Sequence, residues 1–282
     1  IILTLVLFVV AYPLYWVIIS SISAPSAVSS GKVLLHPIGF TLKGYAEVFK
    51  NDQVMRGFLN SLIITFCGVM VNLIVTLPTS YALSRSNFSG KKPITIFYLI
   101  TMFFSGGLIP TYLVIQKLQM LNTIWALILP GCLSVYNMIV ARTFFKSNIS
   151  EELYEAAEID GCTQARFFFQ IALPLSKAII AILVLYYGVG HWNSYFSALV
   201  YISDKAKYPL QLVLRNILIT NQTALSQTAT TAAARAALQE KQQLIDVMKY
   251  SLIIISSIPV LVMYPLVQKH FVKGVMIGSM KG

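Results

Sequence analysis

The chain has 282 residues, of which 57% are hydrophobic and 11% are charged, and its mean hydropathy is +0.74. So much apolar surface excludes an ordinary soluble domain and indicates a protein whose solvent is largely lipid. The formal net charge is +11, but no basic patch is interleaved with aromatic residues as on a nucleic-acid surface. Basic residues also flank membrane spans and set their orientation, so we expect a membrane and no nucleic-acid partner.

Six segments are long and apolar enough to cross a bilayer. They cover about residues 1–22, 58–83, 94–115, 122–141, 178–202 and 250–268. The chain begins at Ile1 inside an apolar run without a leading Met, so we expect that the natural start is missing. We interpret this run as a span and not as a signal peptide, because about 19 apolar residues exceed the usual 7–15 of a signal sequence.

These segments contain no Asp, Glu, Lys or Arg, and His191 is their one readily titratable side chain. Ion-coupled transporters usually carry ionisable residues inside the helix bundle, so the pattern disfavours a secondary transporter. Prolines and glycines interrupt several segments, either as simple kinks or because the helices pack around something. They are Pro13, Pro78, Gly106, Gly107, Pro110, Pro130, Pro259 and Pro265.

Short basic connections indicate the orientation. Residues 84–93 carry three basic residues, whereas residues 116–123 carry only Lys117. The positive-inside rule therefore places 84–93, 142–177 and both termini in the cytoplasm, and 23–57 and 203–249 outside. Within the second external segment, "AAARAALQEKQQLIDVMKY" has high helix propensity and is expected to form a helix, either a docking surface for an external partner or a solvated connector.

No pattern of catalytic or metal-binding residues is present. The cysteines are odd in number without a CxxC pair, and the three histidines do not cluster, so we expect no disulfide, metal or redox site. They are Cys67, Cys132, Cys162, His36, His191 and His270. The chain also lacks HExxH, paired intramembrane carboxylates and the phosphate-binding GxxxxGK[ST], so we expect neither an enzyme nor an ATP site on this chain.

Five of the ten acidic residues fall between Glu151 and Asp160, in the segment 146–177 that we call the acidic loop. Ser150 is a predicted N-cap with acids in the first turn, and Gly161 stands where a helix end needs positive φ. A second short helix is expected from a Thr163 cap to Pro174. Helices lying on anionic membranes usually present Lys and Arg, so this acidic surface favours a protein partner.

The first of these helices is predicted to be two-faced. One face is small and largely apolar, and the opposite face is acidic. The first comprises Ile149, Leu153, Ala156, Ala157 and Asp160, and the second Glu151, Glu155 and Glu158.

The segment "EAAEIDGCTQARFFFQIALP" (155–174) resembles the EAA loop of binding-protein-dependent ABC importer permeases. The spacing from Glu155-Ala156-Ala157 to Gly161, Ile171 and Leu173-Pro174 matches that motif throughout. "YALSR" (81–85), "LIPTYLVIQKLQMLNTIWALILP" (108–130) and "FVKGVMIGSMKG" (271–282) look like the carbohydrate branch, which includes the smaller maltose permease subunit. "YPLQLVLRNILI" is similar to a subgroup associated with complex oligosaccharides.

The resemblance implies an all-α membrane protein of the type I importer permease fold, a single domain of residues 1–282 with six spans, in the bacterial cytoplasmic (inner) membrane. It implies a second permease subunit, two ATPase subunits that hold ATP and Mg, and an extracytoplasmic binding protein that delivers a sugar. A coupling helix in the acidic loop would contact an ATPase. The implied coupling residues are Glu155, Ala156, Ala157, Asp160, Gly161 and Pro174.

The solute path is expected in "YYGVGHWNSYFSAL", because aromatic faces stack on sugar C–H faces and polar groups bind hydroxyls; aromatic packing is the alternative. The candidates are Tyr187, His191, Trp192, Asn193, Tyr195 and Phe196, with Gly106, Gly107 and Tyr112 as weaker ones. The sugar stays open, and polyols, glycerol phosphate or an acidic oligosaccharide such as a uronate fragment are alternatives.

Overall fold

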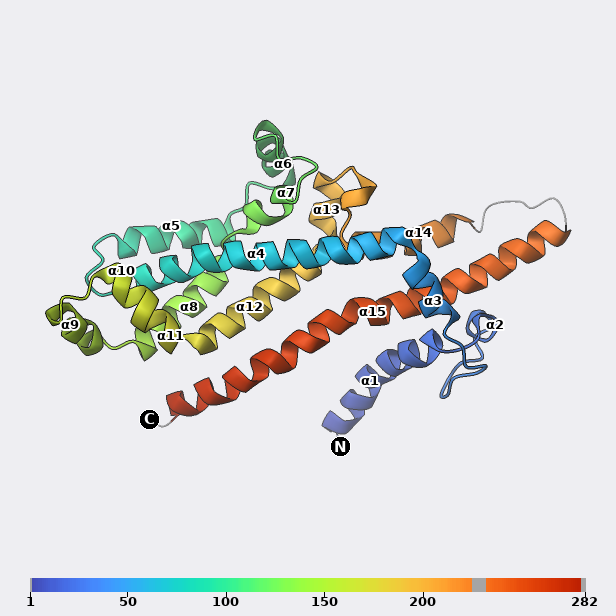
Figure 1. Ribbon diagram of the computed structural model, residues 1–282, viewed down its shortest axis with the longest axis horizontal. Helices are drawn as coiled ribbons and strands as arrows, with labels where there is room; N and C mark the ends of the chain where they lie inside the picture. Colours follow the sequence, from blue (N-terminus) through green and yellow to red (C-terminus); the bar gives the residue numbers. More distant parts are fainter. Residues whose placement is uncertain (1, 225–231, 280–282) are drawn as a thin grey trace. The chain divides into compact units, whose positions relative to one another are not determined.

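The computed structural model describes residues 2–224 and 232–279, and all regular structure in these ranges is helical (Figure 1). The elements in chain order are α1 (Ile2–Ser21), α2 (Pro25–Ser29), α3 (Lys43–Lys50), α4 (Asp52–Ser84), α5 (Lys91–Phe103), α6 (Leu108–Lys117), α7 (Trp125–Ile128), η1 (Leu129–Gly131), α8 (Val135–Asn148), α9 (Glu151–Ile159), α10 (Gln164–Phe167), η2 (Phe168–Ala172), α11 (Leu173–Leu175), α12 (Lys177–Trp192), α13 (Tyr195–Tyr201), η3 (Lys205–Lys207), α14 (Leu210–Ala224) and α15 (Ala232–Ser279). Side chains are described for 2–219, 242–265 and 267–268.

Three described helices are each long and apolar enough to cross a membrane: α1, α4 and the part of α15 from Gln242 to Pro265. Three further candidates are pairs of helices bent at a short break. These pairs are Lys91–Phe103 with Leu108–Lys117 (113°), Trp125–Gly131 with Val135–Asn148 (52°), and Gln164–Leu175 with Lys177–Trp192 (80°). By length and composition, the described residues therefore include three helices that could cross a membrane, or up to six candidate spans if each bent pair is one span.

The boundaries differ from the predicted ones where the backbone breaks. The predicted segments 94–115, 122–141 and 178–202 are each divided between two or more helices, not one. Gly107 has φ +88°, which ordinary residues avoid, and Pro130 has no N–H to continue a helix. Pro13 and Pro78, in contrast, stay inside continuous helices. The expected helix over "AAARAALQEKQQLIDVMKY" is confirmed, and it forms the beginning of α15.

The contacts divide the chain into two units, and the first comprises residues 1–61 and 204–261. Its core is a small apolar cluster of Ile19, Ala27, Val28, Val33 and Val247. At its edge the Trp16 ring meets Tyr250 edge-on at 5.1 Å, and its Nε1–H donates to the Val33 carbonyl at 2.8 Å. Asn60 and Ser61, at the beginning of α4, bind the backbone of residues 206–210.

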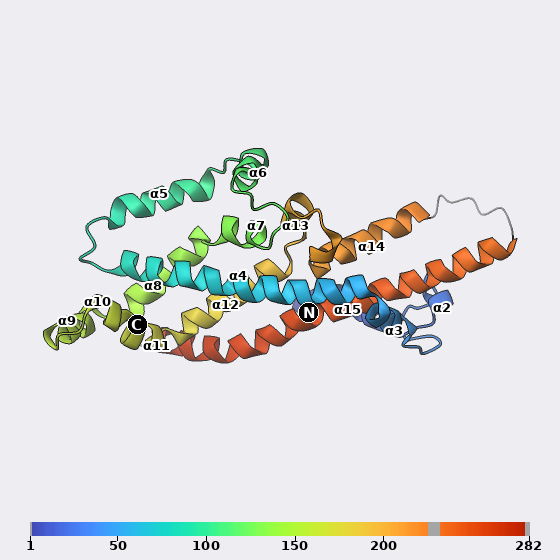
Figure 2. The same ribbon diagram turned by 45° about the horizontal axis from the view of Figure 1, so that its top comes forward.

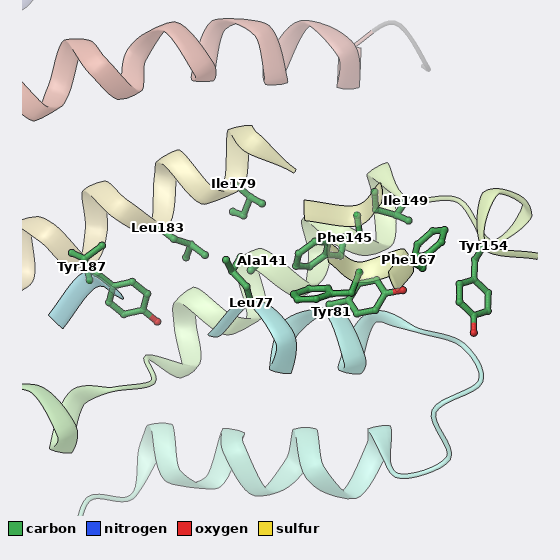
Figure 3. Close-up of a cluster of buried hydrophobic side chains, with 13 residues drawn as sticks. Leu77, Tyr81, Ala141, Phe145, Ile149, Tyr154, Phe167, Ile179, Leu183 and Tyr187 are labelled. Atoms are coloured by element: carbon green, nitrogen blue, oxygen red, sulfur yellow. The ribbon is translucent and has the colours of Figure 1, made fainter. Parts of the chain in front are cut away.

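The second unit comprises residues 62–203 and 262–282. Its apolar core joins α4, α8, α9, α10, η2 and α12 around Tyr81 and Phe145, as Figure 3 shows. The α9–α10 segment lies beside the end of α4 in both ribbon views (Figures 1 and 2).

Within this second unit, one face of α4 carries polar side chains at four-residue intervals, which we call the polar stripe. All four side chains are buried. They are Asn72, Thr76, Ser80 and Ser84. The first three hydrogen-bond neighbouring segments, which is how polar side chains join helices in lipid.

Candidate functional site

The acidic loop has the two caps that its sequence predicts. The Ser150 Oγ accepts from the Leu153 N–H at 3.3 Å, and the Thr163 Oγ1 accepts from the Arg166 N–H at 3.3 Å. Between these caps Gly161 has the predicted positive φ, +75°. The Gly161 and Cys162 N–H groups donate back to the carbonyls of Glu158 and Ala157, at 3.0 and 2.9 Å. This is the Schellman arrangement, so the first helix ends at a fixed point and the chain turns sharply.

Tyr154 is the main packing residue on the inward face of α9. Its side chain is buried, and its ring meets Phe167 edge-on at 5.2 Å (Figure 3). Phe167 stacks on Tyr81 of α4 at 6.4 Å, and Tyr81 meets Phe145 of α8 at 5.6 Å. Such aromatic pairs stabilise beyond their buried area. Aromatic contacts therefore attach the acidic loop to α4 and α8.

An ion pair adds a second attachment. Glu151, in the first turn of α9, pairs with Arg85, which directly follows α4. The Arg85 guanidinium also lies 4.4 Å above the Tyr154 ring. The predicted apolar face of α9 is thus only partly correct: Tyr154 and Ala157 face inward, whereas Leu153 and Ala156 are exposed, because the aromatic cluster of α4 and α10 receives Tyr154.

The opposite side of α9 presents an apolar strip to the surroundings, formed by Leu153, Ala156 and Ile159, which we call the outward strip. Ile159 is 86% exposed and Leu153 38%. Acids border the strip, and among the side chains that the structure describes they have no ion-pair partner. These acids are Glu152, Glu155, Glu158 and Asp160. An apolar surface with a polar rim is typical of a protein docking site.

A π turn, η2, follows α10 and leads to Pro174. Proline cannot donate to the carbonyl four residues earlier and clashes with it, so a wider turn before Pro174 accommodates the ring. After Ser176 the chain bends by 80° into α12. This bend places the acidic loop at an angle to α12.

A second group of predicted residues surrounds the break between α7 and α8. The Asn72 Nδ2 donates to the Gly131 carbonyl at 2.8 Å, and its Oδ1 lies 2.7 Å from the His191 Nε2. Because the amide N–H₂ is used on Gly131, Oδ1 is the acceptor and the imidazole carries a proton on Nε2. Gly68 makes room for this ring: a Cβ there would lie 2.4 Å from Nε2.

The same break is supported by Tyr187. Its hydroxyl lies 2.7 Å from the Thr76 Oγ1 and accepts from the Ser134 N–H at 3.2 Å. Side chains of α4 and α12 therefore hydrogen-bond backbone groups that the broken helix leaves without helical partners, as a helix break at membrane depth requires.

The residues predicted for the solute path differ in how far their side chains are exposed. Tyr187 and Trp192 are buried, whereas Asn193, Tyr195 and Phe196 are exposed. Gly106 and Gly107 lie in the break between α5 and α6, and the Tyr112 ring stacks on Tyr201 at 6.2 Å. The structure brings His191 together with Asn72, and Tyr187 with Thr76, but no such contact joins Tyr195 or Phe196 to the polar stripe.

Comparison with known proteins decides the family. Over 96% of its length the chain is 37% identical to the polygalacturonan/rhamnogalacturonan transport system permease protein YtcP of Bacillus subtilis (strain 168), covering 92% of that protein. The chain belongs to the sugar ABC transporter permease family. The permease is also 40% identical over 96% of its length to the protein LplC of the same strain, covering 89% of it, although no family model matches.

A solved structure agrees in fold. It is that of a bacterial ABC transporter involved in the import of the acidic polysaccharide alginate, which superposes with a TM-score of 0.85 at 28% identity, covering 96% of the permease and 94% of the other chain. The permease is therefore an all-helical integral membrane protein of the ABC importer permease fold, and the secondary-transporter alternative is not supported.

Three features of the permease were not predicted from its sequence: the polar stripe, the exposure of Ile159 and the pairing of Arg85 with Glu151. The polar stripe has a visible signal, since polar residues recur every four positions through an apolar span. Ile159 also has one, because it stands on the acidic side of α9 in the helical wheel. The pairing of Arg85 with Glu151 has none, because the partners are 66 residues apart.

We predict that Gly161→Leu destabilises the turn after α9 by about 1–2 kcal/mol, the cost of left-handed backbone for an L-residue. Nothing lies within 4 Å of a Cβ at this position, so the cost is conformational and not steric. Gly161→Asn is the matched control, because asparagine tolerates this conformation. Thermal unfolding of the purified permease should rank glycine above asparagine and asparagine above leucine; equal loss in both variants would contradict the backbone explanation.

Proposed function

We propose that the permease is the membrane-spanning subunit of an ATP-driven importer and crosses the membrane six times, each bent helix pair counting as one span. Its domain would cover residues 1–282, with 84–93, 142–177 and both termini in the cytoplasm and 23–57 and 203–249 outside. The three long apolar helices and three bent pairs support this count.

The acidic loop would be the coupling element. The outward strip carries this proposal, because it combines exposed apolar side chains with acids that have no ion-pair partner among the described side chains. The other face of this helix packs on Phe167 of α10, within the apolar cluster that also includes α4 and α8. Such a helix can contact a partner and pass its motion to the spans. Glu155 and Asp160 would meet basic or polar groups of the partner, and Ala156 would allow close approach. Ala157, predicted for the same contact, packs inward against the core and would instead help to hold α9 in place, and Gly161 would set the turn.

The partner would be an ATPase subunit, because the chain has no phosphate-binding motif of its own. Two ATPases with ATP and Mg, a second permease subunit and an extracytoplasmic binding protein would complete the transporter. ATP would drive transport only if its binding favoured one membrane conformation over the other, and the docked loop would transmit that preference.

We expect Glu155→Lys to weaken ATPase docking by about tenfold or more, because it places a cation where an anion meets the partner. Glu47→Lys is the control, since Glu47 lies in a proposed external segment and its ion-pair partner among the described side chains is Lys50. The measurement is copurification of the ATPase together with transport in liposomes. Normal docking and transport in the Glu155 variant would contradict the coupling assignment.

The carried solute would be an oligosaccharide, and we favour an acidic one. A relative at 37% identity is named for polygalacturonan and rhamnogalacturonan, and the similar solved structure is described for alginate import. The two proposed external segments carry ten basic and five acidic residues, a net charge of +5. Positive potential on that side would favour approach of an anionic sugar and its binding protein.

Uptake of an oligogalacturonate and of a neutral oligosaccharide of equal length would separate these substrates. With the cognate binding protein and ATPase, the acidic sugar should stimulate ATP hydrolysis and enter the liposomes. Stimulation by the neutral sugar alone would reject the acidic substrate while leaving the transporter assignment intact.

In the solute path we assign different roles to the predicted residues. Asn193, Tyr195 and Phe196 are exposed and could contact sugar directly. The Tyr187 hydroxyl and the His191 Nε2 are hydrogen-bonded within the helix bundle, so these residues would shape the path rather than line it.

A further inference from the structure

We propose that Arg85 is a positioning residue for coupling: it ties α9 to the end of α4, so that movement of the docked loop pulls on this span. The inference rests on the proposed function and adds to it a specific mechanical connection inside the permease.

The Arg85 guanidinium contacts side chains of both α9 and α4. Its side chain is only 12% exposed, and its guanidinium pairs with the Glu151 carboxylate. The same group lies 4.4 Å above the Tyr154 ring and 5.7 Å above the Tyr81 ring. It is therefore enclosed by α9 on one side and by α4 on the other, and stacking together with ion pairing suits arginine better than lysine.

The backbone around Arg85 is fixed as well. The Ser86 N–H donates to the second Glu151 oxygen at 3.3 Å, and the Lys91 Nζ donates to the Arg85 carbonyl at 3.1 Å. The carboxylate thus binds both the side chain of Arg85 and the backbone of the next residue, which fixes the first turn of α9 against the connection between α4 and α5.

From Arg85 the connection continues into the bundle along α4. Ser80 hydrogen-bonds the Met138 carbonyl of α8, and Thr76 hydrogen-bonds Tyr187 of α12. In addition, the Arg142 Nε of α8 donates to the Leu83 carbonyl, two residues before Arg85. A displacement of α9 would therefore reach three spans through packed and hydrogen-bonded groups, which is the physical requirement for coupling.

A purely structural role predicts a different outcome from a coupling role. An ion pair whose acid is 44% exposed adds little to stability, so its loss should leave the fold intact. If Arg85 positions the coupling helix, its loss should instead lower the number of sugars transported per ATP hydrolysed.

The test is a charge exchange in the complete transporter, reconstituted with ATPase and binding protein. Arg85→Glu and Glu151→Arg should each lower transport per ATP at least about fivefold, a typical coupling effect, and the double exchange should recover most of it. Arg85→Lys, which keeps the charge but loses the fork geometry, should fall between. Lys92→Glu is the matched control, since Lys92 is exposed and has no ion-pair partner among the described side chains.

Two results would overturn the proposal: a double exchange no better than the worse single variant, or single variants in which transport and ATP hydrolysis fall in the same proportion. If Arg85→Glu does not assemble, Glu151→Gln removes the pair without reversing a charge and is judged by the same ratio. If Glu155→Lys disturbs docking but the Arg85 and Glu151 variants keep a normal ratio, only this inference fails. If none of these variants affects docking or the ratio, the proposed function fails with it.

Discussion

Gly68→Val is expected to destabilise the permease by about 1–3 kcal/mol or more, the usual cost of forcing extra atoms into a packed core. The Cβ alone would lie 2.4 Å from the His191 Nε2 and 2.6–2.7 Å from two ring carbons. The ring cannot move aside freely, because Nε2 donates to Asn72, whose amide also supports the Gly131 carbonyl. Displacing the ring would leave buried polar groups without partners.

The neighbouring sequence offers a matched control and a suppressor. Gly190→Val changes a glycine of α12 one position before His191, but no atom lies within 4 Å of a Cβ there, so a much smaller loss is expected. His191→Ala should partly rescue Gly68→Val, because it removes the clashing ring. The double variant should therefore lose less stability than the sum of the two single losses. Thermal unfolding in detergent measures the unchanged permease, the three single variants and the double variant. Equal losses at Gly68 and Gly190, or no rescue by His191→Ala, would contradict the close approach.

Ile159→Asp is expected to abolish transport while leaving the permease folded. Ile159 is 86% exposed at the end of α9, so no internal packing is lost when it is replaced. If the outward strip docks on an ATPase, its largest exposed apolar side chain should contribute about 2 kcal/mol or more to binding, roughly a thirtyfold loss of affinity when removed. An added carboxylate beside Glu155 and Asp160 would increase the loss through desolvation.

Two control variants distinguish the loss of an apolar docking contact from the general effect of an added negative charge. Ile159→Met keeps an apolar side chain of similar volume and should retain transport. Phe40→Asp places the same carboxylate on a side chain that is 71% exposed in a proposed external segment, and it should leave ATPase binding unchanged. Binding of the purified ATPase to each variant, together with unfolding temperature, measures the effect. Full ATPase binding by Ile159→Asp would remove the outward strip from the docking site.

Local signals in the sequence were sufficient for the elements of the acidic loop. Ser150, Thr163 and Gly161 act through contacts within a few residues of themselves, so their types predict caps and a turn that the structure confirms. The apolar lengths of α1 and α4 are equally local properties and were predicted with small errors at the ends.

Long-range pairing was not accessible in this way. Nothing near Arg85 indicates that Glu151 is its partner, and nothing near Gly68 indicates that His191 fills the space it leaves. For the same reason the burial of Tyr154, which decides the faces of α9, depends on Phe167 and Tyr81 from other helices. Gly107 and Pro130 can be recognised in the sequence as residues that interrupt helices. The angles at these breaks, 113° and 52°, depend on tertiary packing.

The central claim, that the acidic loop docks on an ATPase, is tested most directly by site-specific photo-crosslinking in the assembled transporter. A photoreactive side chain at Ala156, exposed on the outward strip, is compared with one at Phe40. The account predicts a crosslink from position 156 to the ATPase subunit, whose yield changes when ATP is bound, and no such crosslink from position 40. An ATPase that copurifies with the permease but never crosslinks from position 156, with or without ATP, would contradict it.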